Sequence, residues 1–282
     1  MYVPWPEWLP LPNSGYNMTM QPEIAHRILA LNQEFYQTFA LQFSQTRQRI
    51  QPGVRRILDA LDLEANILDL GCGTGQAIKP LLKRYKKSSL LSLDMAERML
   101  LEAKKKYRWL DRKWLVNGDM ERLPLKDHCV DMIFSSLALQ WSNDLATTFS
   151  EFKRVGRAGG LLMFTTFGVN TLKELRQSWL DIDNSPRVHE FADMHDIGDL
   201  LMSARLAEPV MDMENIVVEY RDFNDLLRDL KAIGATNAEQ SRSRGLMTAG
   251  KLKALKQAYE KIALVDGRYQ ATYEVVYGHA WF

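Results

Sequence analysis

A glycine-rich segment follows an apolar run near residue 70 and restricts the folds that this chain can adopt. Ile67–Leu70 has the composition of a buried strand and leads into Gly71, Gly73 and Gly75, which occupy every second position. Glycine adopts backbone conformations that other residues avoid, and it has no side chain to hold a ligand away. The helix that follows such a turn presents unpaired N–H groups. The segment therefore predicts a strand, a tight turn and a helix whose backbone approaches a ligand.

The segments around this turn follow the pattern of an α/β sheet. Short apolar runs alternate with helical stretches up to about residue 167, as in a parallel sheet with helices on both faces. The expected strands are Ile67–Leu70, Leu90–Leu93, Lys113–Val116, Asp131–Phe134 and Leu161–Thr165, and two expected helices are Ala96–Tyr107 and Asp144–Val155. Gly159-Gly160 is expected to make the turn into the fifth strand. We predict a Rossmann-like, doubly wound, mostly parallel sheet.

The two ends of the chain have a different character. After Phe167 we expect helices at Leu172–Trp179, Met194–Ala204, Phe223–Ile233 and Lys251–Ile262, with strands only at Asn215–Tyr220 and Thr272–Tyr277. These helices would form a cap at about 168–205 and 222–264. The cap would be inserted after the fifth strand, and it would belong to a single domain that spans residues 63–282. Residues 1–62 would be a proline-rich tail and a helical lid, with helices at 21–50 and from Val54 to Leu61.

Composition and charge exclude several classes of function. The formal net charge is +1, so no overall field attracts nucleic acid or an anionic membrane. Cys72 and Cys129 have no Cys or His at metal-ligand spacing, so we expect neither disulfides nor a metal. Residues 1–13 lack a basic leader and a long apolar run. We therefore expect a cytoplasmic, monomeric protein with no nucleic-acid or membrane partner.

Acidic positions near the turn distinguish between two ligands. The dinucleotide motif spaces its glycines as G-x-G-x-x-G, but Gln76 stands where its third glycine would fall. Asp69, two residues before Gly71, would repel a pyrophosphate but could hold the ammonium group of an amino acid. The turn therefore favours S-adenosylmethionine over a nicotinamide dinucleotide.

Two further acidic residues follow expected strands. Asp94 ends the second strand about 20 residues after the turn, where a carboxylate can accept both ribose hydroxyls. Asp119 follows the third strand and could accept from the adenine amino group while Met120 packs on the ring. Each alone would more often be a solvated loop residue, and the glycine turn alone could simply pack a helix on a sheet. Together they predict a cofactor site at the carboxyl ends of the strands.

At this point the chain resembles the class I S-adenosylmethionine-dependent methyltransferases, and more narrowly the malonyl-[acyl-carrier protein] O-methyltransferases of biotin synthesis. The broad resemblance rests on Asp69–Gly75, Asp94, Gly118-Asp119 and Asp131–Ser135. The narrow one covers about residues 116–277, and its most specific segments are Leu139-Gln140-Trp141 and Leu230–Asn237. The resemblance adds Met95 and Ser135 to the expected cofactor-binding residues.

The resemblance implies methyl transfer to the free carboxylate of a malonyl thioester on carrier protein, an early step of biotin synthesis. That carboxylate is ionised at neutral pH, so no general base is needed. Gln140 and Trp141, after the fourth strand, are the expected catalytic residues, although Trp141 could equally be a core aromatic. Family members also have an aromatic residue in a segment that closes over the site. Phe43 is the aligned residue here, and Tyr36, further upstream, is the third expected catalytic residue.

The resemblance also implies a basic surface that docks the acidic carrier protein. One candidate group is Lys104, Lys105, Lys106 and Arg108, and the other is Arg242, Arg244, Lys251, Lys253 and Lys256. We expect the second group because it lies in the cap. Arg154 could bind substrate, but a solvated or helix-end arginine is the favoured interpretation, and His189 and His195 are expected at the surface of the cap.

Two other functions stay open at this point. One is a methyltransferase of the same fold that acts on a quinone or another small acid. The other is an assembly factor that binds S-adenosylmethionine without transferring a methyl group, because a fold does not fix a function. Leu230–Asn237 argues against the first. Use of malonyl-coenzyme A and the role of the tail are left open.

Overall fold

The computed structural model describes residues 65–107, 113–183, 188–232 and 248–282. Predictions for other residues lie outside this part of the chain; they concern Tyr36, Phe43, the amino-terminal tail and lid helices, residues 233–237, Arg108, Arg242 and Arg244. None of the helices in the described ranges is long and apolar enough to cross a membrane.

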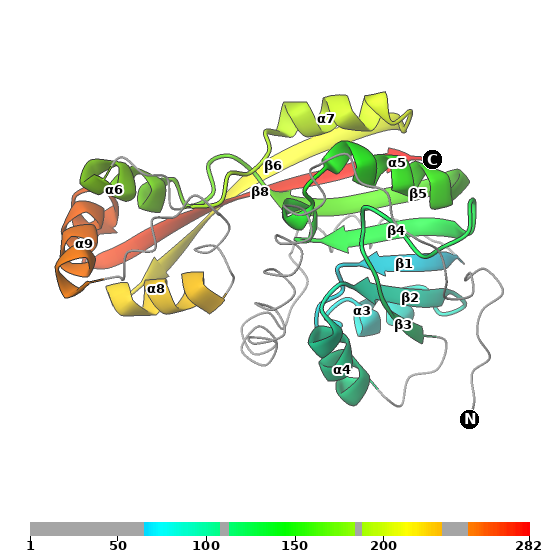
Figure 1. Ribbon diagram of the computed structural model, residues 1–282, viewed down its shortest axis with the longest axis horizontal. Helices are drawn as coiled ribbons and strands as arrows, with labels where there is room; N and C mark the ends of the chain where they lie inside the picture. Colours follow the sequence, from blue (N-terminus) through cyan, green and yellow to red (C-terminus); the bar gives the residue numbers. More distant parts are fainter. Residues whose placement is uncertain (1–64, 108–112, 184–187, 233–247) are drawn as a thin grey trace. The chain divides into compact units, whose positions relative to one another are not determined.

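An eight-stranded sheet organises the fold (Figure 1). The strands are β1 (Asn66–Leu70), β2 (Ser89–Asp94), β3 (Lys113–Asn117), β4 (Val130–Ser136), β5 (Gly156–Phe167), β6 (Ala207–Tyr220), β7 (Leu264–Val265) and β8 (Arg268–Trp281). Their order is β3-β2-β1-β4-β5-β8-β6, and β7 pairs with β8. The first five strands pair in parallel. The predicted doubly wound, mostly parallel sheet is confirmed.

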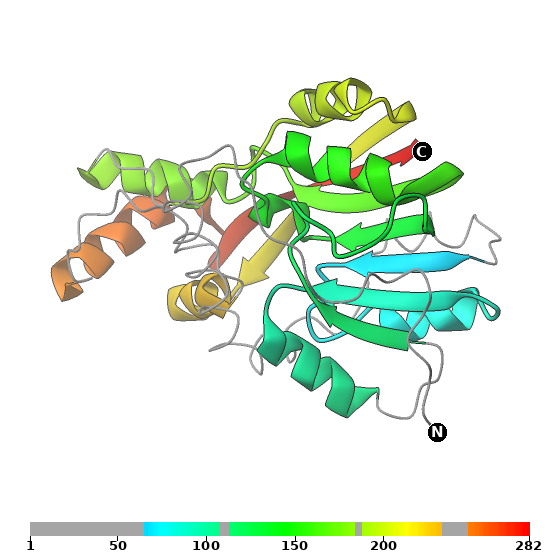
Figure 2. The ribbon, with the colours of Figure 1, turned by 45° about the vertical axis from the view of Figure 1, so that its right-hand side comes forward.

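The helices in the described residues are α3 (Ile78–Arg84), α4 (Glu97–Lys106), the short 3-10 helix η1 (Leu139–Trp141), α5 (Leu145–Val155), α6 (Lys173–Asp183), α7 (Met194–Ser203), α8 (Phe223–Ala232) and α9 (Ala249–Ala263). In this part of the chain, single helices connect β1 to β2, β2 to β3 and, with η1, β4 to β5, and pairs of helices precede β6 and β7. Figure 2 shows α3 and α4 beside β1–β3, and α5 beside β5. Crossovers between parallel strands are right-handed, so α3 and α4 cover one face of the sheet and α5 covers the other.

The strand order places a switch point between β1 and β4. From β1 the chain proceeds outward to β2 and β3, and it then returns to β4 on the other side of β1. The loops after β1 and β4 diverge there, so the carboxyl ends of these two strands flank the place where such sheets bind ligands. Both strands have an apolar centre and are mostly buried, as expected for a sheet that is covered on both faces, and their polar residues lie toward the strand ends.

The chain divides into two compact units. Of the described residues, unit 1 comprises 65–107, 113–166, 195–212 and 277–282, and unit 2 comprises 167–183, 188–194, 213–232 and 248–276. Unit 2 has its own apolar core, in which Trp179, Phe223, Leu255 and Tyr259 are buried. Strands β6 and β8 each have residues in both units. The expected cap range 168–205 included α7, whereas residues 195–212 belong to unit 1.

The start of β5 differs from the sequence prediction. Gly159-Gly160 was expected to be a turn before the strand, but both residues lie inside β5. Val130 pairs with Gly156 and Met132 with Leu161, so four residues of β5 lie opposite Asp131. The pair therefore forms an irregular bulge, with Gly159 at a φ of 77°. The predicted turn before the strand is therefore wrong: the strand continues through both glycines because pairing resumes on their amino-terminal side.

Candidate functional site

The glycine turn has the backbone that its sequence requires. Gly71, Gly73 and Gly75 have φ angles of 65°, 54° and 83°, in the left-handed region that favours glycine. A Cβ on Gly71 would lie 2.3 Å from the Cβ of Ala138, in the loop after β4. The turn and the start of the loop after β4 are thus in direct contact beside the switch point.

Asp94 links this turn to the end of β2. One of its carboxylate oxygens accepts from the Gly73 N–H at 2.7 Å, and the other accepts from the Ala96 N–H at 2.8 Å. The Cys72 N–H also donates to the carbonyl of Leu93 at 3.0 Å. These bonds fix the turn against the carboxyl end of β2, although the sequence predicted only a role for Asp94 toward a ligand.

Asn117 performs a similar task at the end of β3, and the sequence reasoning missed it. Its side-chain amide donates to the carbonyls of Asp94 at 3.0 Å and Met95 at 2.8 Å. The next residue, Gly118, donates its N–H to the carbonyl of Asp94 at 3.2 Å. The half-buried Asp119 therefore follows directly beside Asp94 and Met95. The sequence signal that could have indicated this role was an asparagine at the end of an expected strand, directly before Gly118-Asp119.

Asp69 is a buried carboxyl group, with only 2% of its surface exposed. Burial raises its pKa to about 7; the Ser92 hydroxyl, which donates to it at 3.3 Å, lowers the pKa, and the nearby Asp94 raises it. None of the ion pairs found in the described residues involves Asp69. A positively charged group beside Asp69 would favour its ionised form.

Asp94 has a related environment but two backbone donors. Burial raises its pKa to about 6, against the lowering effect of the Ala96 and Gly73 N–H groups. A carboxylate has about four acceptor positions, so two backbone bonds leave room for two hydroxyl donors. Asp94 therefore retains the capacity that the ribose prediction requires.

Two buried hydroxyls complete the candidate cofactor site. The side-chain oxygens of Thr74, in the turn, and Ser135, at the end of β4, are buried without a hydrogen-bond partner in the described part of the chain. Ser135 pairs in register with Leu70, the last residue of β1. Buried polar groups normally have partners, so these two hydroxyls indicate a polar ligand. S-adenosylmethionine fits this set, since its ammonium, carboxylate and ribose groups supply the missing charges, donors and acceptors.

The loop after β4 contains a strained bend. Leu137 is buried and has a φ of 52°, which is uncommon for a residue other than glycine. Its N–H donates to both the carbonyl and the hydroxyl oxygen of Thr165, each at 3.0 Å. Its carbonyl accepts from the Gln140 amide at 2.8 Å, and the Gln140 oxygen accepts from the Thr166 hydroxyl at 3.3 Å. Gln140 therefore ties the bend to β5.

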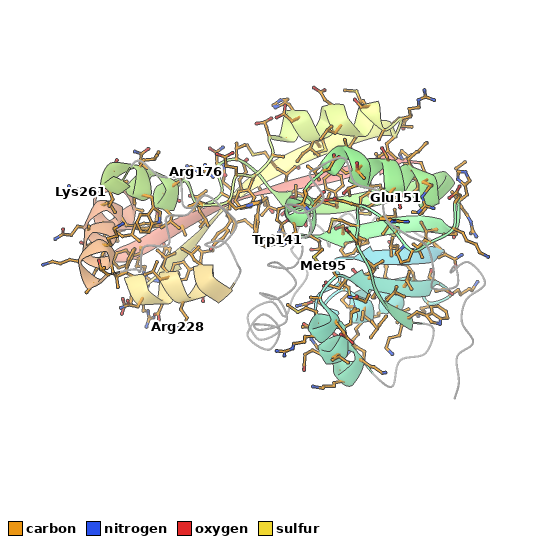
Figure 3. The ribbon with its side chains drawn as sticks, in the orientation of Figure 1. Met95, Trp141, Glu151, Arg176, Arg228 and Lys261 are labelled. Atoms are coloured by element: carbon orange, nitrogen blue, oxygen red, sulfur yellow. The ribbon has the colours of Figure 1, made fainter. Side chains whose placement is uncertain are left out.

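Trp141 ends the 3-10 helix that follows this bend and is half-buried. In Figure 3, Met95 and Trp141 lie at the edge of the sheet toward which β1 and β4 point, whereas Glu151 lies on α5, away from that edge. Glu121, which the sequence reasoning missed, accepts from the N–H groups of Asn143 at 2.5 Å and Asp144 at 3.1 Å. It holds the chain beyond Trp141, and burial raises its pKa.

Arg154 has a structural role. Its guanidinium donates to Glu151 at 2.6 Å, to Asp127 at 2.7 Å and to the carbonyls of Leu123 and Leu125. These bonds fix the loop before β4 on α5, a role that the expected solvated or helix-end arginine did not include. His189 packs its ring on Phe191 at 5.1 Å, and His195 lies in α7.

The structure thus assembles most of the predicted site residues within unit 1. Asp69, the three glycines, Asp94, Met95, Asp119, Met120 and Ser135 all lie at the carboxyl ends of β1–β4 or in the loops that follow them. Gln140 and Trp141 lie in the loop that contacts the turn, and Tyr36 is outside the described residues.

Known proteins resemble this chain in sequence and in fold. A family profile described as "Methyltransferase domain" matches residues 68–164. A malonyl-[acyl-carrier protein] O-methyltransferase of Halorhodospira halophila is 44% identical over 216 residues, which are 76% of this chain and 73% of that protein. One from Gallionella capsiferriformans is 47% identical over 223 residues, 77% of each chain. The solved YcgJ protein of Bacillus subtilis has a TM-score of 0.59 at 14% identity, and the match covers 81% of this chain and 97% of that one.

Proposed function

Because this chain belongs to the malonyl-[acyl-carrier protein] O-methyltransferase family, we propose that it methylates the free carboxylate of a malonyl group on acyl carrier protein, with S-adenosylmethionine as the methyl donor. This reaction would form a malonyl methyl ester early in biotin synthesis. The ester hides a negative charge that would otherwise distinguish malonyl from longer neutral acyl chains.

One observation carries the substrate part of the proposal. The methyltransferase-domain profile matches residues 68–164, but the relative from Halorhodospira halophila is 44% identical over 216 residues. More than half of the 216 aligned residues therefore lie outside the segment that the general methyltransferase profile matches. Residues beyond the cofactor site have no reason to be alike among unrelated methyltransferases, so this extent favours a shared acceptor.

The cofactor, when bound, supplies a methyl group on a positively charged sulfur. Asp69 would hold the ammonium group of the cofactor, Asp94 the ribose hydroxyls, and Asp119 with Met120 the adenine ring. The Thr74 and Ser135 hydroxyls, which have no partner in the described chain, supply further polar contacts. Three carboxylates near one cationic ligand favour its binding electrostatically.

The acceptor requires orientation rather than proton removal. A malonyl carboxylate is ionised at neutral pH, so the chain needs to place one of its oxygens in line with the methyl group and to exclude water. We propose that Trp141 forms part of the wall that does so. Gln140 uses both ends of its amide to hold the Leu137 bend, so we assign it as a positioning residue rather than one that touches the acceptor.

A methyl-transfer assay tests the proposal. Purified protein is incubated with S-adenosylmethionine carrying a labelled methyl group and with malonyl, acetyl or free carrier protein, or malonyl-coenzyme A. We expect a labelled methyl ester on malonyl carrier protein, a slower reaction with malonyl-coenzyme A, and none with the acetyl form, which lacks the carboxylate. Labelling of a quinone or an unrelated acid, but not of malonyl carrier protein, would reject the acceptor. Cofactor binding without any transfer would instead favour a non-methylating role.

A further inference from the structure

Positive charge is concentrated in one segment of unit 1. Residues 78–106, from α3 to the end of α4, contain nine Lys and Arg but only three Asp and Glu. The whole chain has a formal net charge of only +1, so the remainder is negative overall. Such an asymmetry creates a local field that attracts an acidic partner, although the net charge of the chain gives no hint of it.

The two helices of this segment pack on neighbouring strands, α3 on β2 and α4 on β2 and β3. Both cover the same face of the sheet because β1, β2 and β3 are consecutive neighbours joined by right-handed crossovers (Figure 2). The ring of Tyr107, at the end of α4, also lies 3.0 Å from the position of a Cβ on Gly75, just before α3. Lys79 and Lys83 of α3 and Lys104 of α4 are exposed.

An apolar side chain lies within the cationic part of α4. Leu101 is 48% exposed, although a leucine of an amphipathic helix normally faces the core. Its neighbours on the helix surface include Arg98 at i−3, Lys104 at i+3 and Lys105 at i+4, all exposed. An apolar contact surrounded by cations suits an acidic protein helix, whereas nucleic acid needs only the charges.

Several of these cations form no ion pair with the part of the chain that the structure describes. Lys79, Lys83 and Lys104 make no ion pair with a described carboxylate, and Lys105 pairs with Glu102 at 2.7 Å. On α9, the other basic helix, Lys256 approaches Glu260 at 3.8 Å, while Lys253 and Lys261 make no ion pair with a described carboxylate, so ion pairing does not separate the two surfaces and the net charge around them decides. Acidic residues also outnumber basic ones among the described residues of unit 2. Charge therefore favours α3 and α4 over the cap surface expected from the sequence.

We propose that the surface formed by Lys79, Lys83, Arg98, Leu101, Lys104 and Lys105, here called the α3–α4 surface, docks the acidic acyl carrier protein. The proposal rests on the proposed function for the identity of the partner. Met95, beside the candidate cofactor site, comes two residues before α4, and Leu101 is six residues further along the chain. At 1.5 Å per helical residue this separation is about 9 Å along the helix, a distance that an extended pantetheine arm covers.

Two matched charge reversals test the surface. One variant carries Lys79→Glu, Lys83→Glu and Lys104→Glu, and its control carries Lys253→Glu, Lys256→Glu and Lys261→Glu on α9. The net charge change is the same in both, and all six lysines are exposed. A third variant, Leu101→Ser, removes the apolar contact without changing charge. Melting temperature and S-adenosylmethionine affinity, measured for each, show that unit 1 is intact.

The readouts separate docking from chemistry. The affinity for labelled carrier protein is measured by fluorescence anisotropy in low and high salt, and kcat/KM is measured for malonyl carrier protein and malonyl-coenzyme A. We expect the α3–α4 reversal to weaken carrier binding at least about tenfold in low salt and to lower kcat/KM for the carrier substrate similarly. The rate with malonyl-coenzyme A should change less than about twofold, and the α9 reversal should leave both substrates nearly unaffected. Leu101→Ser should weaken binding in high salt as well.

Three results would overturn the proposal. The first is an α9 reversal that weakens carrier binding as much as the α3–α4 reversal does. The second is unchanged carrier binding in the α3–α4 variant. The third is tighter binding of the wild type to an RNA oligonucleotide or to anionic phosphatidylglycerol vesicles than to carrier protein. If carrier binds through this surface but no methyl ester forms, the proposed function fails and the docking stands.

Discussion

The pH dependence of cofactor affinity tests the assignment of Asp69 directly. In the protein alone, burial raises the pKa of Asp69 to about 7, and that of Asp94 to about 6. A bound ammonium group favours the carboxylate form of Asp69, so binding lowers this pKa and releases a proton when the starting pH is below about 7. Affinity is therefore greatest between the pKa of Asp69 and that of the ligand's α-amino group, and it is lost as the pH falls through about 7.

The size of the effect follows from the two pKa values. Between pH 7.5 and pH 6, the ionised fraction of Asp69 falls about eightfold and that of Asp94 about twofold, given pKa values of about 7 and about 6. An α-amino group titrates at about 7.7 to 8.0, so slightly more of the ligand is protonated at pH 6. The combined effect is about a tenfold weaker affinity at pH 6, or about 1.4 kcal/mol.

Isothermal titration calorimetry at pH 6, 6.5, 7 and 7.5 measures this change. Repeating each titration in two buffers of different ionisation enthalpy gives the number of protons released, which should be about 1.4 at pH 6, about 0.9 from Asp69 and about 0.5 from Asp94. The Asp69→Asn variant should bind more weakly at pH 7.5 and should lose most of the dependence on pH, whereas the melting temperature reports whether it folds. An equally steep pH dependence in Asp69→Asn would refute the argument.

Three further predictions concern single substitutions. Asp94→Ala removes the acceptor of the Gly73 and Ala96 N–H groups, so it should weaken cofactor binding by roughly 1.5 to 3 kcal/mol in calorimetry; unchanged affinity in a folded variant would exclude Asp94 from the site. Without ligand, the folded state disfavours the Asp69 carboxylate, so Asp69→Asn should stabilise the protein by about 2 to 4 kcal/mol in denaturant unfolding at pH 7.5 and by little near pH 4. Asp144 caps α5 by accepting from the N–H groups of Ala146 and Thr147, so Asp144→Ala should cost about 1 kcal/mol in the same unfolding assay without altering cofactor affinity.

Much of the sheet was predictable because its signals are local. The buried strands are short apolar runs, and the glycines at positions 71, 73 and 75 mark the turn with φ angles that only glycine adopts readily. Strand ends were harder to predict because pairing decides them. β8 spans Arg268–Trp281, whereas the sequence indicated only Thr272–Tyr277, since its outer residues lack a clear alternating pattern.

The cofactor-binding residues were predictable because each follows a recognisable strand. Parallel strands bring their carboxyl ends to the same edge of the sheet, so residues at those ends lie close together. The roles of Asn117 and Glu121 were not predictable, because their partners are backbone groups of other loops. For Gln140 the sequence predicted a functional position but not its role. The structure shows that its amide N–H donates to the Leu137 carbonyl and that its amide oxygen accepts from the Thr166 hydroxyl.

The Thr74 and Ser135 hydroxyls, which have no hydrogen-bond partner among the described residues, and the buried Asp69 should also influence how long the protein survives in a cell. Polar groups buried in this way destabilise the protein in the absence of a ligand, and any ligand that satisfies them shifts the balance toward the folded chain. A cofactor present at about a hundred times its Kd contributes about 2.7 kcal/mol, which lowers the unfolded fraction about a hundredfold. Proteases degrade mainly unfolded chains, so the half-life should lengthen as the cofactor concentration rises. Starvation for methionine would then remove this protein from the cell as well as slow its reaction, and a pulse-chase measurement of its abundance would reveal the loss.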